Sequence, residues 1–196
     1  GRPVRYRSRG SCGSHSSGCA HGLPRHSSCE IMTERPFRVL FVCTGNTCRS
    51  PLAEAIARRE LGKRGWAGVV EVASAGVAAG EGQGASDGSR IVAQEADLDL
   101  TEHRSRLLTR EMALEADLIL GMSGSHVARV VALTEDAKVA LLGDFAHDTP
   151  LGGPSVPDPF GGPVEFYRET YHALEGLVNR SLDRLPRPLD VGEDRS

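Results

Sequence analysis

The sequence predicts an α/β fold with three layers, in which a four-stranded parallel sheet is flanked by helices. Two observations predict it. Between residues 37 and 182, short apolar runs of strand length alternate with longer segments that have helical spacing. The first run, at residues 39–42, is apolar throughout, as in a strand buried on both faces of a parallel sheet. Because such sheets bind ligands at the carboxyl ends of their strands, the loop after this strand is the first candidate for a site.

That loop, at residues 42–51, reads Val-Cys-Thr-Gly-Asn-Thr-Cys-Arg-Ser-Pro. Ser50 is a plausible helix N-cap, and Pro51 suits the first helical turn, where its missing N–H costs nothing. Residues 52–59 then have helical spacing, and two glycines at positions 62 and 65 end the helix. The loop therefore connects a buried strand to a helix N-terminus.

The rest of the chain continues the alternation of strands and helices. The connection at 143–163 is the exception, because it has no periodicity and is stiffened by five prolines. The expected elements are a strand at 69–75, a helix capped by Ser86, a short helix near 109–115, a strand at 118–120, a helix at 123–133, a strand at 138–142 and a helix at 164–182 with Tyr167, Tyr171, Leu174 and Val178 on one face.

The loop after the first strand has the residues of an anion site. Backbone amides and the helix N-terminus would point at one spot, with Arg49 as a bidentate clamp and Cys43 beneath. A thiol placed there is expected to ionise at neutral pH. The alternative is that Cys43 is a small apolar residue that ends a strand. That alternative leaves Gly45, Asn46, Arg49 and Ser50 without an explanation.

Asp158 is a candidate general acid on the proline-rich connection. It stands between Pro157 and Pro159, so its backbone is restricted on both sides. Long loops in compact domains more often have a function than not. The alternative is a turn aspartate that only caps Phe160.

Together these residues predict phosphoryl transfer through a covalent intermediate. The Cys43 thiolate would attack a phosphorus atom held by the loop amides and Arg49, and Asp158 would protonate the leaving atom and then activate water. Ser50 could hydrogen-bond Cys43, and Asn46 could pin the loop through side-chain to backbone bonds. This chemistry requires no metal.

The chain has five cysteines, an odd number without the spacing of a disulfide framework, which favours a reducing compartment and a cytoplasmic location. Cys43 and Cys48 lie in the part expected to fold. They are close enough in sequence for oxidation to join them in a disulfide that would shield the nucleophile.

The first 35 residues are predicted to be disordered, because they are basic, rich in serine and glycine, and without apolar periodicity. Three alternatives remain open: an organelle transit peptide, a metal site, or residues upstream of a true start at Met32, which we favour. The residues considered for the metal site, as zinc ligands, match no known finger spacing: Cys12, His15, Cys19, His21, His26 and Cys29.

At the other end of the chain, a flexible tail is expected at 185–196.

With a formal charge of −3 and 25% charged residues, the chain has no strong positive potential to attract nucleic acid, so no nucleic-acid partner is expected. No apolar run approaches the roughly 20 residues of a membrane span, so no membrane association is expected. Arg104 and Arg106 could contact a phosphoprotein, but a solvated loop is the favoured interpretation. The histidines at 103, 126, 147 and 172 are interpreted as surface residues, because none repeats at ligand spacing.

Four motifs in this order resemble the low-molecular-weight protein tyrosine phosphatase family: the loop at 42–51, Ser-Ala-Gly at 74–76, Ala-Asp-Leu-Ile-Leu at 116–120 and Asp-Pro-Phe-Gly-Gly at 158–162. The resemblance covers residues 37–182 and implies a phosphatase domain at 36–184, no cofactor and a phosphorylated protein as partner, with the oligomeric state left unknown. It makes Cys43 the nucleophile, Arg49 the clamp and Asp158 the acid. The residues expected to bind substrate are Thr44, Gly45, Asn46, Thr47, Cys48, Ser50 and Phe160.

Thr47 and the glycines after Phe160 resemble the bacterial protein arginine phosphatases within that family. Tyrosine-specific members usually have a bulky aliphatic residue in place of Thr47, and a threonine hydroxyl can meet the guanidinium of phosphoarginine. Phosphotyrosine is the alternative substrate. Arsenate reduction would need cysteines after Cys48, and the sequence has none. A non-catalytic phosphoresidue-binding module would not need Cys43 or Asp158.

Overall fold

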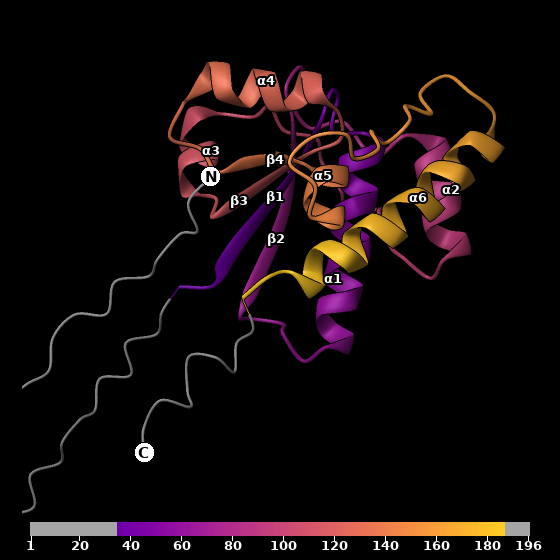
Figure 1. Ribbon diagram of the computed structural model, residues 1–196. Helices are drawn as coiled ribbons and strands as arrows, with labels where there is room; N and C mark the ends of the chain where they lie inside the picture. Colours follow the sequence, from indigo (N-terminus) through magenta and orange to yellow (C-terminus); the bar gives the residue numbers. More distant parts are fainter. Residues whose placement is uncertain (1–34, 187–196) are drawn as a thin grey trace, which may run out of the picture. The chain divides into compact units, whose positions relative to one another are not determined.

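The computed structural model describes residues 35–186 of the chain. Within this range a four-stranded parallel sheet with the order β2-β1-β3-β4 carries helices on both faces (Figure 1), which confirms the predicted fold class. The bounds are β1 Phe37–Cys43, α1 Arg49–Lys63, β2 Val70–Gly76, α2 Asp87–Glu95, α3 Arg110–Glu115, β3 Leu118–Gly121, α4 Gly124–Leu133, β4 Val139–Leu141, α5 Leu142–His147 and α6 Val164–Asp183.

Strand β1 divides the hydrophobic core into two layers. Alternate residues of a strand point to opposite faces, so Val39 and Phe41 join one core cluster and Leu40 and Val42 join the other. The first cluster includes apolar residues of α1, α2, α5 and α6, and the second includes those of α3 and α4. Figure 1 shows the two sets of helices on opposite sides of the sheet. The continuous apolar run therefore predicted a strand that is buried on both faces.

The carboxyl ends of the strands meet at one edge of the sheet. Cys43 at the end of β1 is in register with Gly76 at the end of β2, and Val42 is in register with Gly121. A Cβ at Gly76 would lie 2.5 Å from the carbonyl oxygen of Thr44 and 2.9 Å from the nitrogen of Asn46. The loop after β1 can fold over β2 only because residue 76 has no side chain.

Two expectations about element boundaries were wrong. The segment at 143–163 is not a loop throughout, because α5 occupies its start and ends at His147, capped by Asp148 in the left-handed conformation with φ of 55°. A helix of six residues is too short to show a period in the sequence. Ser50 is not the N-cap of α1, since Cys48 holds that position and α1 begins at Arg49. The remaining boundaries lie within one or two residues of the predicted ones.

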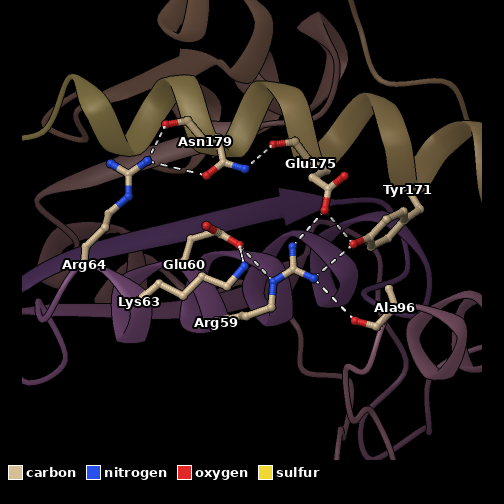
Figure 2. Close-up of polar contacts among 8 residues, drawn as sticks. All are labelled: Arg59, Glu60, Lys63, Arg64, Ala96, Tyr171, Glu175 and Asn179. Atoms are coloured by element: carbon tan, nitrogen blue, oxygen red, sulfur yellow. Dashed lines mark hydrogen bonds and ion pairs between the residues drawn. The ribbon is translucent and has the colours of Figure 1, made fainter.

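A polar seam joins α1 to α6 on one side of the sheet (Figure 2). Arg59 of α1 donates hydrogen bonds to the Glu175 carboxylate at 2.8 Å and the Tyr171 hydroxyl at 3.2 Å, both on α6. It also donates to the carbonyl of Ala96, just beyond α2, at 3.4 Å. Burial lowers the pKa of Arg59, but the bonds to Glu175 and Tyr171 outweigh it and raise that pKa above its ordinary value. The seam fixes the helix that follows the Cys43 loop.

The predictions for the N-terminal extension and for most of the C-terminal tail concern residues outside 35–186. At the two ends of the described range, Arg35 forms an ion pair with Asp117 at 2.7 Å and Leu185 is buried in the core. Within that range, no helix is long and apolar enough to cross a membrane.

Candidate active site

The site is built on two loops. The Cys43 loop, residues 43–50, leads from β1 into α1, and the Asp158 loop, residues 148–163, leads from α5 to α6. The two are tied to the end of β3, because the Met122 amide donates to the Val42 carbonyl at 3.0 Å and the Met122 carbonyl accepts from the Val156 amide at 2.9 Å. The backbone of three segments that are far apart in sequence thus converges at the carboxyl edge of the sheet.

The thiol of Cys43 lies at the base of its loop and is 2% exposed. Its sulfur is 2.9 Å from the Ser50 hydroxyl oxygen. The Ser50 hydroxyl also accepts a bond from the Asn46 amide at 2.9 Å and donates to the Ala75 carbonyl at 3.3 Å. Rotation of the hydroxyl from Ala75 to the nearby Cys43 sulfur would give its proton to a thiolate, while Asn46 still donates to the Ser50 oxygen. The hydroxyl is thus placed to stabilise negative charge on Cys43.

Asn46 holds the loop from inside. It is fully buried in the left-handed backbone conformation, with φ of 53°, which asparagine tolerates better than most residues. Its amide nitrogen donates to Ser50 and to Ser74 at 2.8 Å, and its amide oxygen accepts from the Arg106 backbone at 3.0 Å. The expected bond to the backbone is present, but hydroxyl groups are the partners of the amide nitrogen.

Arg49 reaches across to the Asp158 loop. Its side chain is 6% exposed, and Nη2 lies 2.5 Å from Oδ2 of Asp158. Nη1 donates to the Val156 carbonyl at 3.4 Å. Nε is the one buried side-chain nitrogen or oxygen of residues 35–186 that has no partner. Because buried donors are nearly always paired, Nε is a donor suited to an anion.

Asp158 contacts the Cys43 loop through Arg49, a pairing that the sequence did not predict, and also makes the turn contact with Phe160. Oδ2 pairs with Arg49, while Oδ1 accepts from the Phe160 backbone at 3.3 Å, the bond of a turn aspartate. Its side chain is 48% exposed. The Phe160 side chain is 74% exposed, and its backbone bond to Asp158 is the hydrogen bond that links it to the other predicted site residues.

The far side of the Cys43 loop contacts α2. The Thr47 carbonyl accepts from the Ser86 backbone at 2.9 Å, and the Cys48 thiol donates to the Ser86 hydroxyl at 3.2 Å. Thr47 is half-buried, with its hydroxyl 3.7 Å from the Cys48 sulfur, and both Cys43 and Cys48 are free thiols. A Cβ at Gly45 would meet the Thr47 hydroxyl at 3.5 Å, which is an ordinary contact. Contacts within the protein therefore do not explain why residue 45 is a glycine.

Two of the four histidines interpreted as surface residues hold the Cys43 loop instead. His126 is 3% exposed and bonds Thr44, and His103 bonds the Asn46 carbonyl through Nε2 at 2.7 Å. The interpretation of His126 was therefore wrong. His147 and His172 are exposed, as expected, and so are Arg104 and Arg106.

Ser74, which the sequence marked only as part of a motif, links Asn46 to the Glu54 carboxylate at 2.6 Å. Its position near the carboxyl end of β2 was the available signal.

Comparisons with known proteins agree with this arrangement. Residues 38–190 match the sequence model described as low molecular weight phosphotyrosine protein phosphatase. The chain is 40% identical to a protein-arginine-phosphatase of Geobacillus stearothermophilus, over 76% of this chain and 97% of that protein. It is 34% identical to the low molecular weight protein-tyrosine-phosphatase Etp of Escherichia coli K12, over 76% of this chain and 95% of Etp.

Among solved structures, a cysteine-to-serine variant of YwlE arginine phosphatase, described as having a phosphorylated active site serine, superposes with a TM-score of 0.72. The sequence identity is 32%, and the match covers 79% of this chain and 99% of that one. A family model matched over most of the chain, relatives of nearly full length and a shared fold lead to one conclusion. The chain belongs to the low-molecular-weight phosphotyrosine protein phosphatase family.

Proposed function

We propose that this protein is a cysteine-dependent protein phosphatase that removes the phosphoryl group from phosphoarginine in proteins. The observation that carries the proposal is the meeting of Cys43, Arg49 and Asp158, which supplies a nucleophile, an anion clamp and an acid. The buried, unpartnered Nε of Arg49 and the neighbouring loop amides are the donors that a phosphoryl group needs.

In the first step the substrate phosphoryl group replaces Asp158 on the Arg49 guanidinium. The Cys43 thiolate attacks phosphorus, an S–P bond forms and the P–N bond to the arginine side chain breaks. Protonated Asp158 gives its proton to the departing nitrogen, so arginine leaves as a neutral or cationic guanidine rather than an anion. The phosphorylated serine of the YwlE variant supports covalent transfer to this position.

In the second step water attacks phosphorus and the S–P bond breaks. The Asp158 carboxylate takes a proton from the water, and the Cys43 sulfur leaves as a thiolate that receives a hydrogen bond from Ser50. The products are inorganic phosphate and the free enzyme. The residues balance charge and protons through both steps without a further group.

Three features favour phosphoarginine. Thr47 presents a hydroxyl where an aliphatic side chain would leave a guanidinium N–H unpaired. Asp158 accepts from a guanidinium in the structure, since its partner is Arg49, and one oxygen of the protonated carboxyl can still accept from the guanidinium of a substrate while the other donates. The G. stearothermophilus relative is named a protein-arginine-phosphatase. We place the enzyme in the cytoplasm, where the free thiols of Cys43 and Cys48 stay reduced.

Phosphotyrosine is the second candidate, because the family description and Etp both carry that specificity in their names. The exposed ring of Phe160 could stack on a phenol as well as on a guanidinium.

Release of inorganic phosphate from a phosphoarginine protein, from a phosphotyrosine peptide and from p-nitrophenyl phosphate tests the proposal. The wild-type chain should turn over the phosphoarginine protein, and Cys43→Ser should not, although it should still bind phosphate. Turnover by Cys43→Ser equal to the wild type would contradict the mechanism. A wild-type chain that binds phosphate but turns over none of the three substrates would be a binding module.

A further inference from the structure

His126 lies between the Cys43 loop and α4. It is the third residue of α4, and its imidazole is buried at the carboxyl edge of the sheet. Nδ1 lies 2.8 Å from the Ser123 hydroxyl, which precedes the helix, and Nε2 lies 2.9 Å from the Thr44 hydroxyl. The side chain therefore bridges a helix start and the residue directly after the nucleophile.

Thr44 carries the contact onward to the clamp. Its hydroxyl oxygen accepts a bond from Nη2 of Arg49 at 3.4 Å, and that same nitrogen pairs with Asp158. Ser123, His126, Thr44 and Arg49 thus form a continuous chain of polar contacts. At its end is the guanidinium nitrogen that the two loops share.

The donor and acceptor groups of these residues determine the direction of each hydrogen bond in the series. A guanidinium only donates, so Thr44 is an acceptor toward Arg49, and this polarises its hydroxyl as a donor toward Nε2 of His126. Nδ1–H then donates to Ser123. A neutral imidazole has this one donor and one acceptor. Burial, together with the positive charge of Arg49, lowers the pKa of His126 to about 4 against the opposing effect of Asp158.

We propose that His126 is a positioning residue, which through the Thr44 hydroxyl holds Nη2 of Arg49 ready to receive a phosphoryl group. This inference rests on the proposed function, because it assigns a phosphoryl group to Arg49. Without the imidazole, the exposed Thr44 hydroxyl is free to turn to water. The orientation of Nη2 then depends on Asp158, the group that the substrate displaces.

Two substitutions test the contacts of the two imidazole nitrogens separately. The side-chain amide of His126→Gln can reach the position of Nε2 and contact Thr44, whereas that of the shorter His126→Asn can replace only Nδ1 and contact Ser123. The dissociation constant of inorganic phosphate, measured by calorimetry on the full chain, is the readout. We expect His126→Asn and Thr44→Val each to weaken binding about three- to tenfold, and His126→Gln to stay within about twofold of wild type.

A merely structural role would lower the melting temperature without this order of affinities, so thermal unfolding is recorded for every variant. His172→Asn, on the exposed surface of α6, is the matched control and should leave phosphate affinity unchanged. His126→Asn combined with Thr44→Val should bind no more weakly than Thr44→Val alone, because both break the same contact.

Equal affinities of His126→Asn and His126→Gln, or additive losses in the double variant, would overturn the inference. Failure of the proposed function would look different. The wild-type chain would then release no phosphate from phosphorylated substrates, while the binding series would still give its answer for His126.

Discussion

Nη2 of Arg49 lies 2.5 Å from Oδ2 of Asp158, so this ion pair joins the Cys43 loop to the Asp158 loop. The two residues are 109 positions apart in the sequence. In the proposed mechanism an incoming phosphoryl group needs the same guanidinium, so the Asp158 carboxylate would compete with the substrate before acting on it. The pair would then influence both binding and chemistry.

Replacing Asp158 with Asn should separate these two effects. The turnover number should fall about a hundredfold or more, because the leaving nitrogen loses its proton donor. Phosphate binding should tighten, since no carboxylate competes for Arg49. Steady-state kinetics with inorganic phosphate as inhibitor measure both. A fall in turnover together with weaker phosphate inhibition would show that Asp158 does not compete.

Ser50→Ala tests the hydroxyl beside the nucleophile. Removing a hydrogen bond to an ionised group costs about 1.5–3 kcal/mol, so we expect about a 10- to 100-fold loss in turnover. Because sulfur leaves as a thiolate in the second step, phosphocysteine should accumulate. A burst of p-nitrophenol before the steady state would report it. Loss of turnover without any burst would place the effect of Ser50 before phosphocysteine breakdown.

Arg59→Met tests the seam between α1 and α6 shown in Figure 2. Glu175 and the Tyr171 hydroxyl lose a partner, so unfolding in urea at pH 7 should show a loss of about 1–3 kcal/mol. The exposed pair of Arg90 with Asp87 supplies the control, because Arg90→Met should cost less than about 0.5 kcal/mol.

The same seam predicts a dependence of stability on pH. The hydrogen bond from Arg59 lowers the pKa of Glu175, and burial acts against it. A carboxylate with a lowered pKa in the folded state stabilises the fold at neutral pH and loses that contribution as pH falls below its ordinary range, near about 4.5. The difference in stability between wild type and Arg59→Met should therefore shrink between pH 6 and pH 3. A difference that stays constant over that range would assign the loss to packing.

Thr47→Ile tests the origin of specificity. The branched aliphatic side chain removes the hydroxyl, so the ratio of kcat/KM for phosphoarginine over phosphotyrosine should fall about tenfold. Thr47→Ser, which keeps the hydroxyl, should retain the preference. An unchanged ratio in Thr47→Ile would assign the preference to another residue.

The sequence predicted the elements whose signals are local. Residues 39–42 of β1 are a continuous apolar run, and the Cys43 loop stands between a recognisable strand and a recognisable helix. The N-cap of α1 was misassigned, because the Ser50 hydroxyl is directed to Cys43, Asn46 and Ala75 instead of the helix amides. Local preference gave way to tertiary contacts there.

The burial of His126 had no signal of this kind. Its partner Thr44 is 82 positions away, and only the pairing of β1 with β3 brings them together. The ion pair of Arg49 with Asp158 depends likewise on how the Asp158 loop crosses the end of β3. Single-residue patterns indicate which residues can react, while the sheet determines which of them meet.

The measurement that tests the central claim most directly is kcat/KM of the wild-type chain for a phosphoarginine protein, compared with that for phosphotyrosine peptides. The presence of Thr47 and the guanidinium-binding carboxylate of Asp158 predict the higher value for phosphoarginine. A higher value for phosphotyrosine would contradict the proposed specificity.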